Sequence, residues 1–310
     1  SFSYTPNADF NGSDSFIYKA NDGALDSNVA TATLTVNPAN DAPVVTTTPG
    51  STGYSENAAP VAIDPGLLVS DVDSAMLNSA TVRIAVNYAS GEDVLAFSDQ
   101  LSISGSWNAA TGTLTLTGTA PVADYQTALR TITFKNSSED PAILVRTVEF
   151  TVSDGMAPST PATRSVSVVS INDAPTTADV NASGAEDAPS IAITLSGNDV
   201  DGTVDRFSLT TLPANGILYA DPGLTLAAAT GTDYTASGQT LALYFVPASN
   251  WNGTTSFQYA SRDAQNLSDA TPATATITVS SVNDAPVLVA NTPLTVPEEA
   301  TRTLTSANLQ

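Results

Sequence analysis

An all-β fold built from tandem β-sandwich modules is the architecture that this sequence of 310 residues predicts. Apolar and polar residues alternate with a period of two along most of the chain, which is typical of half-buried antiparallel strands. Turn-forming residues interrupt these runs at intervals of about 8–12 residues, as they do between the short strands of a sandwich. The tetrapeptide NDAP occurs three times, and such recurrence indicates a modular array.

The alternation of apolar and polar residues is clearest in residues 30–36, ATATLTV, where threonines occupy one face and alanine, leucine and valine the other. Threonine and valine suit a pleated surface because they are stiff at χ1. The Asn-Gly pair at 11–12 predicts a turn between two apolar runs. Residues 122–129 predict one short helix. We expect Trp107 and Trp251 to belong to the cores rather than to a ligand-binding surface.

The three NDAP tetrapeptides divide the chain into modules of sandwich size. Their aspartates are Asp41, Asp173 and Asp284, which lie 132 and 111 residues apart (173 − 41 and 284 − 173). We therefore expect four segments: 1–43 as the C-terminal part of a preceding repeat, 44–175 and 176–286 as complete repeats, and 287–310 as the start of a following repeat. Ser1 and Gln310 both fall inside strand-like patterns, so we expect an internal piece of a longer protein.

The composition excludes several classes of function. The chain has 31 acidic and 9 basic residues, a formal net charge of −22, and neither Cys nor His. Without these two residue types there is no disulfide, no thiolate site, no Ser-His-Asp triad and no His-ligated zinc. The negative charge repels nucleic acid and anionic membrane surfaces, which excludes both as partners. No apolar run reaches the roughly 18 residues that a membrane span needs.

An aspartate closes the strand that precedes each linker. Asp22, Asp154 and Asp263 each continue the parity of the inward-facing residues of their strand. A carboxylate on the core-facing parity costs free energy unless it is paired, bound to a metal or placed at the mouth of the sandwich. The end of a strand is such a mouth, so the three aspartates are candidate ligands of a cation.

A second pair of carboxylates occurs early in each complete repeat, as Asp71 with Asp73 and as Asp199 with Asp201. In an extended Asp-X-Asp both side chains face one way, about 6.5–7 Å apart along the strand. These pairs, the strand-end aspartates and the Asn-Asp linkers could therefore converge where two repeats meet.

Two tracts resemble known repeats. Gly91–Pro141 is similar to the cadherin-like, dystroglycan-type repeats of large bacterial surface adhesins, and PASNWNGTTSFQYASRDAQ, at 247–265, resembles the companion repeat of the same proteins. The resemblance implies Ig-like or cadherin-like β-sandwich modules in an extended array, placed outside the cell. It implies a Ca²⁺-rigidified extender region, as in RTX adhesins, surface filaments and biofilm proteins. The RTX nonapeptide GGxGxD itself does not occur in this sequence.

The resemblance extends to the Ca²⁺ sites of animal cadherins, in which an upstream acid, an Asn-Asp linker, an Asp-X-Asp pair and a strand-end Asp hold the ions. The cofactor implied is Ca²⁺, which accepts 6–8 oxygen ligands in flexible geometry. Carried over residue by residue, the ligand sets are Asn40, Asp41, Asp71, Asp73 and Asp154 near the first linker; Glu56, Asn172, Asp173, Asp199, Asp201 and Asp263 near the second; and Glu186, Asn283 and Asp284 near the third.

A plain structural interpretation stands beside the metal hypothesis. Loop aspartates commonly cap turns and bind nothing. Glu56 and Glu186 can equally be surface acids, and the pairs Glu92-Asp93 and Glu139-Asp140 are expected to be solvated loops. The linker is also shorter than in cadherins, and no clear second acidic motif occurs in the upstream module. We therefore expect one or two ions at each junction rather than three.

Three classes of function compete. The first is a structural spacer, whose partners are the adjacent repeats of the same chain, with self-association in a filament and glycans bound by other regions as further partners. The second is a carbohydrate- or peptide-binding adhesive module, which needs an open coordination position on one exposed tip. The third is an enzyme, since a glycosidase needs only two carboxylates about 5–9.5 Å apart. Because the aspartates recur from repeat to repeat, the sequence favours the spacer and predicts no enzyme.

Overall fold

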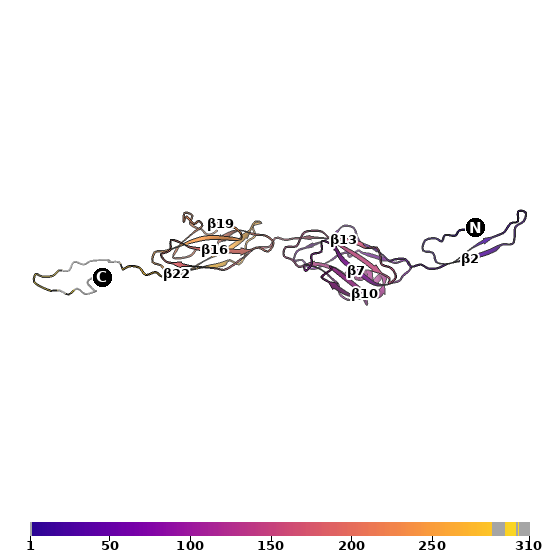
Figure 1. Ribbon diagram of the computed structural model, residues 1–310, viewed down its shortest axis with the longest axis horizontal. Helices are drawn as coiled ribbons and strands as arrows, with labels where there is room; N and C mark the ends of the chain where they lie inside the picture. The colour runs from indigo at the N-terminus through magenta and orange to yellow at the C-terminus, as the bar shows by residue number, and fades with distance from the viewer. Residues whose placement is uncertain (1, 287–294, 302, 304–310) are drawn as a thin grey trace. The chain divides into compact units, whose positions relative to one another are not determined.

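The computed structural model describes residues 2–286, 295–301 and 303, and their regular structure is almost entirely β (Figure 1). The predicted all-β class is confirmed. The chain separates into two compact units, Ser1–Ile171 and Asn172–Gln310. The predicted division into four segments stays a prediction, and most of segment 287–310 lies outside the described residues. None of the helices described is long and apolar enough to cross a membrane.

The first unit begins with a two-stranded hairpin. Strand β1 (Gly12–Tyr18) pairs antiparallel with β2 (Ala30–Val36), so that Phe16 lies opposite Ala32 and Tyr18 opposite Ala30. The same register recurs in the second unit, where Phe257 lies opposite Ala275. The hairpin β1-β2 and the strand pair at 253–263 and 273–280 therefore share one pattern of pairing.

The rest of the first unit, which we call module 1, is a sandwich of strands β3 to β13. A six-stranded sheet in the order β4-β13-β12-β7-β10-β9 accompanies smaller sheets β5-β11-β8 and β3-β6. The strands are β3 (Val44–Thr46), β4 (Ser51–Ser55), β5 (Val61–Ala62), β6 (Leu68–Ser70), β7 (Met76–Val86), β8 (Asp93–Ala96), β9 (Ser104–Asn108), β10 (Thr113–Pro121), β11 (Thr133–Asn136), β12 (Arg146–Ser153) and β13 (Ala162–Val169). Most pairs are antiparallel, but β4 pairs parallel with β13.

The core of module 1 is filled by residues of alternating parity, as the sequence predicts. Along β12, Val148, Phe150 and Val152 are buried between half-buried neighbours. The predicted helix is confirmed as α1 (Val122–Arg130), which buries Tyr125 and Leu129 against the same core. The helix is short, so packing of this apolar face stabilises it more than intrinsic propensity does.

Asp93 and Arg146 form a buried ion pair inside module 1. The expectation that Glu92-Asp93 is a solvated loop is therefore wrong for Asp93. Asp93 is 1% exposed and Arg146 is fully buried. The Arg146 Nε atom lies 3.1 Å from Asp93 Oδ2, and the Asn136 side chain donates to Asp93 Oδ1 at 2.7 Å. The Nη1 atom of Arg146 donates to the carbonyl oxygens of Ala142 and Leu144. All of these bonds are charge-assisted, so the buried charges are compensated.

The second unit contains module 2, which is a sandwich of strands β14 to β22. Its sheets have the orders β14-β16-β20-β18 and β15-β22-β21-β17-β19. The strands are β14 (Thr176–Thr177), β15 (Val180–Ala185), β16 (Ile191–Asn198), β17 (Val204–Leu209), β18 (Gly216–Tyr219), β19 (Asp233–Thr235), β20 (Thr240–Pro247), β21 (Gly253–Asp263) and β22 (Ala273–Ser280). As in module 1, the first strand of the larger sheet pairs parallel with the last, here β15 with β22.

The core of module 2 lies between its two sheets. Leu195 and Phe245 from one sheet and Phe207, Phe257 and Tyr259 from the other are at most 1% exposed. The tryptophans pack against the cores as predicted, one in each module, and both are half-buried. Burial of these apolar side chains is the main source of stability for such a fold.

Candidate metal centre

One end of module 2 gathers the predicted ligands of the second linker, which we call the module 2 cluster: Asn172, Asp173, Asp199, Asp201 and Asp263. The Asn172 side chain donates to Asp263 Oδ2 at 2.6 Å. The backbone N–H of Asp173 donates to Asp201 Oδ2 at 3.1 Å. These two bonds attach the linker residues to the Asp-X-Asp pair and to the strand-end aspartate.

The module 2 cluster holds carboxylate oxygens that are buried without a hydrogen-bond donor. Asp199 is 7% exposed, and in the described part of the chain no donor reaches either of its oxygens. Asp201 Oδ1 is likewise buried and unpartnered within the described residues. Burial raises the pKa of Asp199, and the neighbouring carboxylates of Asp201 and Asp263 raise that pKa further. A divalent cation would compensate this charge, since Ca²⁺ prefers carboxylate oxygens.

The strand-end aspartate of module 2, Asp263, both faces the cluster and caps the turn that follows it. Asp263 ends β21 and is fully buried. Its Oδ1 accepts the backbone N–H of Leu267 at 2.7 Å, which closes the loop that follows. Asp263 therefore caps a turn with one carboxylate oxygen and faces the cluster with the other. Its role in the turn does not exclude a role as a metal ligand.

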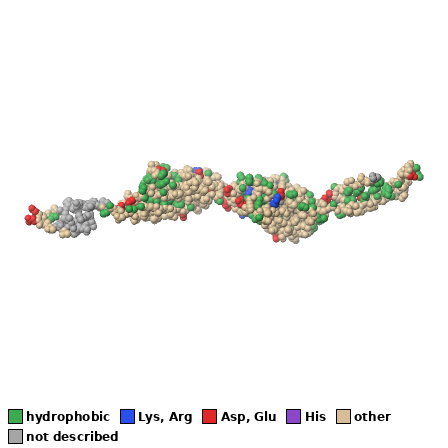
Figure 2. Space-filling view, in the orientation of Figure 1, with side chains coloured by type: hydrophobic (Ala, Val, Ile, Leu, Met, Phe, Trp, Pro, Cys, Tyr) green, Lys and Arg blue, Asp and Glu red, His purple; other side chains and the backbone are tan. Residues whose placement is uncertain are grey.

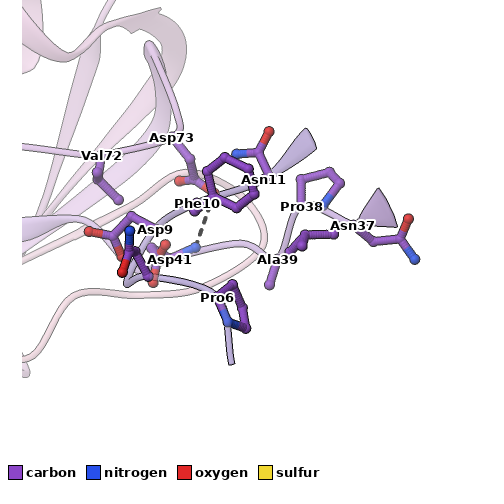
Figure 3. Close-up of a pocket in the computed structure, with 12 residues that line it drawn as sticks. Pro6, Asp9, Phe10, Asn11, Asn37, Pro38, Ala39, Asp41, Val72 and Asp73 are labelled. Atoms are coloured by element: carbon purple, nitrogen blue, oxygen red, sulfur yellow. Dashed lines mark hydrogen bonds between the residues drawn. The ribbon is translucent and has the colours of Figure 1, made fainter. Parts of the chain in front are cut away.

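The same arrangement recurs in the first unit as the module 1 cluster: Asn40, Asp41, Asp71, Asp73 and Asp154. The backbone N–H of Asp41 donates to Asp73 Oδ2 at 3.1 Å (Figure 3). The backbone N–H of Asp173 donates to Asp201 Oδ2 at the same distance. Asp71 Oδ2 and Asp154 Oδ2 are buried and meet no donor among the residues described. The repeated geometry indicates one kind of site made twice by the same local sequence pattern.

Like Asp263 in module 2, Asp154 caps the turn that follows it and also faces its cluster. Its Oδ1 accepts the N–H groups of Met156 and Ala157, both at 2.7 Å. The bond from Ala157 is the largest influence on the carboxyl group, and with the bond from Met156 it holds the pKa of Asp154 below its usual value. Asp154 is therefore kept ionised, as a cation ligand must be.

The Asp-X-Asp pairs are not extended, which corrects the geometry expected from the sequence. Residues 71–73 and 199–201 lie in bends between strands. In the first pair, Asp71 Oδ1 accepts the N–H of Asp73 at 3.2 Å and the N–H of Ser74 at 2.9 Å. An Asp side chain that bonds to the backbone two and three residues on replaces strand hydrogen bonds with a turn. In this bend Asp71 Oδ2 is buried without a donor among the described residues.

Burial alone does not mark these ligands. Asp64 in module 1 is also fully buried, but both of its oxygens have donors. The Thr48 N–H and hydroxyl donate to it at 2.8 Å each, and the Gly66 N–H donates at 3.2 Å. Asp64 is a satisfied structural acid that the sequence did not reveal. The absence of donors, rather than the burial, distinguishes the two clusters.

Glu56 and Glu186 occupy equivalent positions, and the interpretation of them as plain surface acids is wrong. Glu56 is 2% exposed and Glu186 is 8% exposed. Glu56 Oε2 accepts the N–H of Ile171 at 2.7 Å, and Glu186 Oε1 accepts the N–H of Val282 at 2.7 Å. Ile171 and Val282 both directly precede the asparagine of a linker. Each glutamate therefore holds the chain as it leaves its module.

The glutamate and the aspartate cluster lie at opposite ends of each module, as the strand directions require. Asp154 follows β12, which runs antiparallel to β13, whereas Glu56 follows β4, which runs parallel to β13. In module 2, Asp263 ends β21, and Glu186 follows β15, which is parallel to β22. Each module thus has an acidic cluster where the chain enters and a buried glutamate where it leaves.

At the third linker, the described residues include only the upstream part of the predicted ligand set. The Asn283 side chain donates to the carbonyl of Asp284 at 3.3 Å, as Asn40 does to Asp41 and Asn172 to Asp173. Asn283 and Asp284 are exposed. The structure brings them to the end of module 2 that carries Glu186, and it does not bring them together with an Asp-X-Asp pair in the described residues.

The sequence-based prediction missed two acids of the first unit. Glu139 is exposed, and its Oε2 accepts the Asn57 side chain at 2.8 Å, one residue beyond Glu56. Asp9 lines a pocket together with Asp41 and Asp73 (Figure 3). Both acids lie five residues beyond an aromatic residue of the repeat, Tyr4 or Phe134, and alignment of the repeats on that aromatic would have found them.

Two sequence comparisons relate parts of the chain to known proteins. Residues 1–37 match the family model described as Bacterial Ig domain. Over 128 residues, or 40% of this chain, the sequence is 33% identical to halomucin from Haloquadratum walsbyi. The matching stretch spans 1% of the halomucin chain, so the similarity concerns a small part of that protein.

Three solved structures match this chain at low similarity. Protocadherin gamma B2 extracellular cadherin domains 3–6 gives a TM-score of 0.47 at 15% identity, covering 86% of this chain and 57% of the other. Mouse cadherin-23 EC22–24 gives 0.39 at 11% identity, with coverages of 87% and 74%. The human desmocollin-1 ectodomain gives 0.34 at 13% identity, with coverages of 88% and 48%.

Proposed function

We propose that this chain is a Ca²⁺-rigidified spacer segment of a large extracellular adhesin or surface filament. The observation that carries the proposal is a set of buried carboxylate oxygens without donors in the corresponding clusters of two repeats, which share the position of Asp71 and Asp199. These are Asp71 Oδ2 and Asp154 Oδ2 in module 1, and both oxygens of Asp199 with Asp201 Oδ1 in module 2. An uncompensated buried charge costs several kcal/mol, and binding of a cation removes that cost.

The side chains supply what Ca²⁺ coordination requires. Ca²⁺ takes 6–8 oxygen ligands at about 2.3–2.6 Å in flexible geometry, whereas Mg²⁺ demands a tight octahedron. Each cluster offers the carboxylates of an Asp-X-Asp pair and of a strand-end aspartate, with the linker asparagine and aspartate beside them. The clusters contain no Lys or Arg, and the face of the molecule shown in Figure 2 carries few basic side chains. A divalent cation is therefore the natural counterion.

Stiffening follows from how the linker is attached on its two sides. Glu56 holds the N–H of Ile171 on module 1, and Asn172 is held by Asp263 on module 2. Ile171 and Asn172 are consecutive, so few backbone torsions remain free between the two attachments. A cation bound to the module 2 cluster would strengthen the second attachment, because Asp173 and Asp201 belong to its ligand set. The spacer would then transmit force instead of bending at this linker.

The alternative function, a carbohydrate- or peptide-binding adhesive module, fits the clusters less well. A sugar that coordinates Ca²⁺ needs an open position on an exposed loop. Asp199 and Asp263, by contrast, are at most 7% exposed, and equivalent residues recur in module 1. Glycans at a cell surface or matrix are therefore proposed as partners of other regions of the parent protein, and the partners of this segment are its neighbouring repeats.

Thermal unfolding with and without Ca²⁺ tests this proposal. In about 10 mM Ca²⁺, roughly 10–100 times the Kd typical of extracellular Ca²⁺ modules, each occupied site should add about 1.4–2.7 kcal/mol to the free energy of unfolding. We expect the melting temperature to rise by several degrees relative to the protein in EGTA. The same concentration of Mg²⁺ should produce a smaller rise. Identical melting curves in Ca²⁺ and EGTA would exclude the proposal.

A further inference from the structure

We infer that a hollow on module 1, whose lining shares no residue with the acidic clusters, binds a neutral saccharide. The hollow has a volume of about 330 Å³, within the usual size of small-ligand sites. Its lining residues are Ala96, Phe97, Ser98, Gln100, Thr131 and Thr133. The inference goes beyond the proposed function: the spacer role assigns glycans to other regions of the parent protein, and this hollow adds a glycan contact on module 1 itself.

The chemistry of the lining selects an uncharged, polar ligand. The chain has a net charge of −22, yet none of the residues that line the hollow is charged. Without a carboxylate the hollow is a poor cation site, and without Lys or Arg in its lining it is a poor anion site. It combines one aromatic ring with hydroxyl and amide groups. A sugar matches this combination, because its hydroxyl groups exchange hydrogen bonds while its C–H groups pack on the face of a ring.

The ring of Phe97 is fixed in the wall of the hollow. Phe97 follows β8 directly, and its side chain is half-buried against the core of module 1. The ring packs on the backbone of β9 at Gly105, where a Cβ atom would lie 2.7 Å from Phe97 Cδ1. A glycine is therefore required there if the ring is to keep its place. The exposed part of the ring is a rigid apolar surface, which loses little entropy when a ligand packs on it.

The polar groups of the hollow are partly fixed and partly free. Gln100 Nε2 donates to Thr131 Oγ1 at 2.8 Å, and this hydroxyl donates to the carbonyl of Ala128 in α1 at 2.7 Å. The Gln100 side chain is thereby held in one orientation. Its Oε1 atom and the hydroxyl groups of Ser98 and Thr133 have no hydrogen-bond partner among the described residues. A ligand therefore meets one oriented acceptor and two hydroxyl groups that both donate and accept.

A strained turn places Gln100 in the hollow. Gln100 and Ile103 exchange backbone hydrogen bonds at 3.0 and 2.7 Å. Between them, Leu101 and Ser102 have φ values of 53° and 62°. A two-residue turn with two positive φ values favours Asn-Gly, so Leu and Ser adopt this conformation only at a cost in free energy. Strain that the surroundings impose on a loop is typical of ligand-binding sites.

The strained turn is held in place by strand β10 and by helix α1. At Gly118 in β10 a Cβ atom would collide with the carbonyl oxygen of Ser102, so the turn packs directly on the strand. The Tyr125 hydroxyl in α1 donates to the Gly118 carbonyl at 2.6 Å. Among the described residues α1 is the only helix, so module 2 has no copy of this wall. The hollow is therefore a single specialised site and not a feature of every repeat.

Nuclear magnetic resonance titration of the full 310-residue chain with neutral hexasaccharides tests the inference. The probes are cellohexaose, maltohexaose, mannohexaose and chitohexaose, each added to the isotope-labelled protein. We expect at least one of them to shift the amide signals of residues 96–103 and 131–133, and Gln100→Ala and Phe97→Leu to weaken its binding about tenfold. The matched control is Gln258→Ala, which removes an exposed glutamine of module 2 and should bind as the unmodified chain does. The melting temperature of each variant checks that it folds.

The outcomes separate this site from the Ca²⁺ clusters. The lining contains no carboxylate, so the affinity for the sugar should be the same in Ca²⁺ and in EGTA. Binding that disappears in EGTA, or equal affinities of Gln100→Ala and Gln258→Ala, would place the sugar elsewhere and overturn the inference. The absence of binding by all of the hexasaccharides would overturn it as well. Melting in Ca²⁺ and EGTA tests the spacer function separately, and neither result decides the other.

Discussion

Replacement of Arg146 by methionine is expected to lower the free energy of unfolding of module 1 by about 3–5 kcal/mol. Arg146 and Asp93 are both almost fully buried, and their side chains meet at 3.1 Å. Removal of the guanidinium leaves the Asp93 carboxylate buried with only the neutral donors Asn136 and Ala89. The carbonyl groups of Ala142 and Leu144 lose their donor as well, which adds to the cost.

A matched control for this variant exists in the same sheet. Arg83→Met breaks the pair of Arg83 with Glu149 at 3.1 Å, in which the side chains are 52% and 31% exposed. Exposed pairs of this kind contribute about 0–1 kcal/mol. Urea unfolding followed by a probe in each module should show a large shift for Arg146→Met in module 1 and none in module 2. Equal losses for the two variants would show that the buried pair has no special role.

Asp199→Asn is expected to abolish the Ca²⁺-dependent stabilisation of module 2, a loss of about 1.4–2.7 kcal/mol when Ca²⁺ is 10–100 times Kd. In EGTA the same variant should be as stable as the unmodified chain or more stable. The reason is that Asp199 carries a buried charge, has no donor among the described residues and lies beside Asp201. A neutral amide removes that repulsion. The effect of the mutation should therefore change sign between Ca²⁺ and EGTA.

Asp205→Asn is the control for Asp199→Asn. Asp205 lies in the same module, but its side chain is 43% exposed and pairs with Arg206 at 2.8 Å on the surface. This variant should keep the full gain in stability on addition of Ca²⁺. Differential scanning calorimetry of both variants in Ca²⁺ and in EGTA measures the comparison. A loss of stability by Asp199→Asn in EGTA, with an unchanged gain from Ca²⁺, would identify Asp199 as a purely structural residue.

The parts of the fold that follow local rules could be predicted from the sequence. The alternation in residues 30–36 appears as strand β2, and residues 122–129 fall within helix α1. The recurrence of NDAP corresponds to a recurring contact, in which the backbone N–H groups of Asp41 and Asp173 donate to Asp73 and Asp201. Each of these features depends on residues that are close in the sequence or on direct repetition of a motif.

The features that sequence analysis missed depend on contacts between distant segments. Asp93 is buried because Arg146 lies 53 positions further along the chain and pairs with it. Glu56 is buried because Ile171, 115 residues later, donates to it. The bend at Asp71 arises because its side chain bonds to the following backbone, and the alternation of apolar residues carries no signal for that choice. Such contacts become visible only when the strands are assembled.

The most direct test of the central claim is the distribution of distances across the linker at residues 170–175 with and without Ca²⁺. The chain has no cysteine, so Thr115→Cys in module 1 and Thr278→Cys in module 2 give two unique, exposed sites for spin labels. Pulsed electron paramagnetic resonance should give a narrow distribution in Ca²⁺ and a broad one in EGTA, and Asp199→Asn should stay broad in both. Equal widths in Ca²⁺ and EGTA for the otherwise unmodified chain would contradict the proposal that Ca²⁺ rigidifies the spacer.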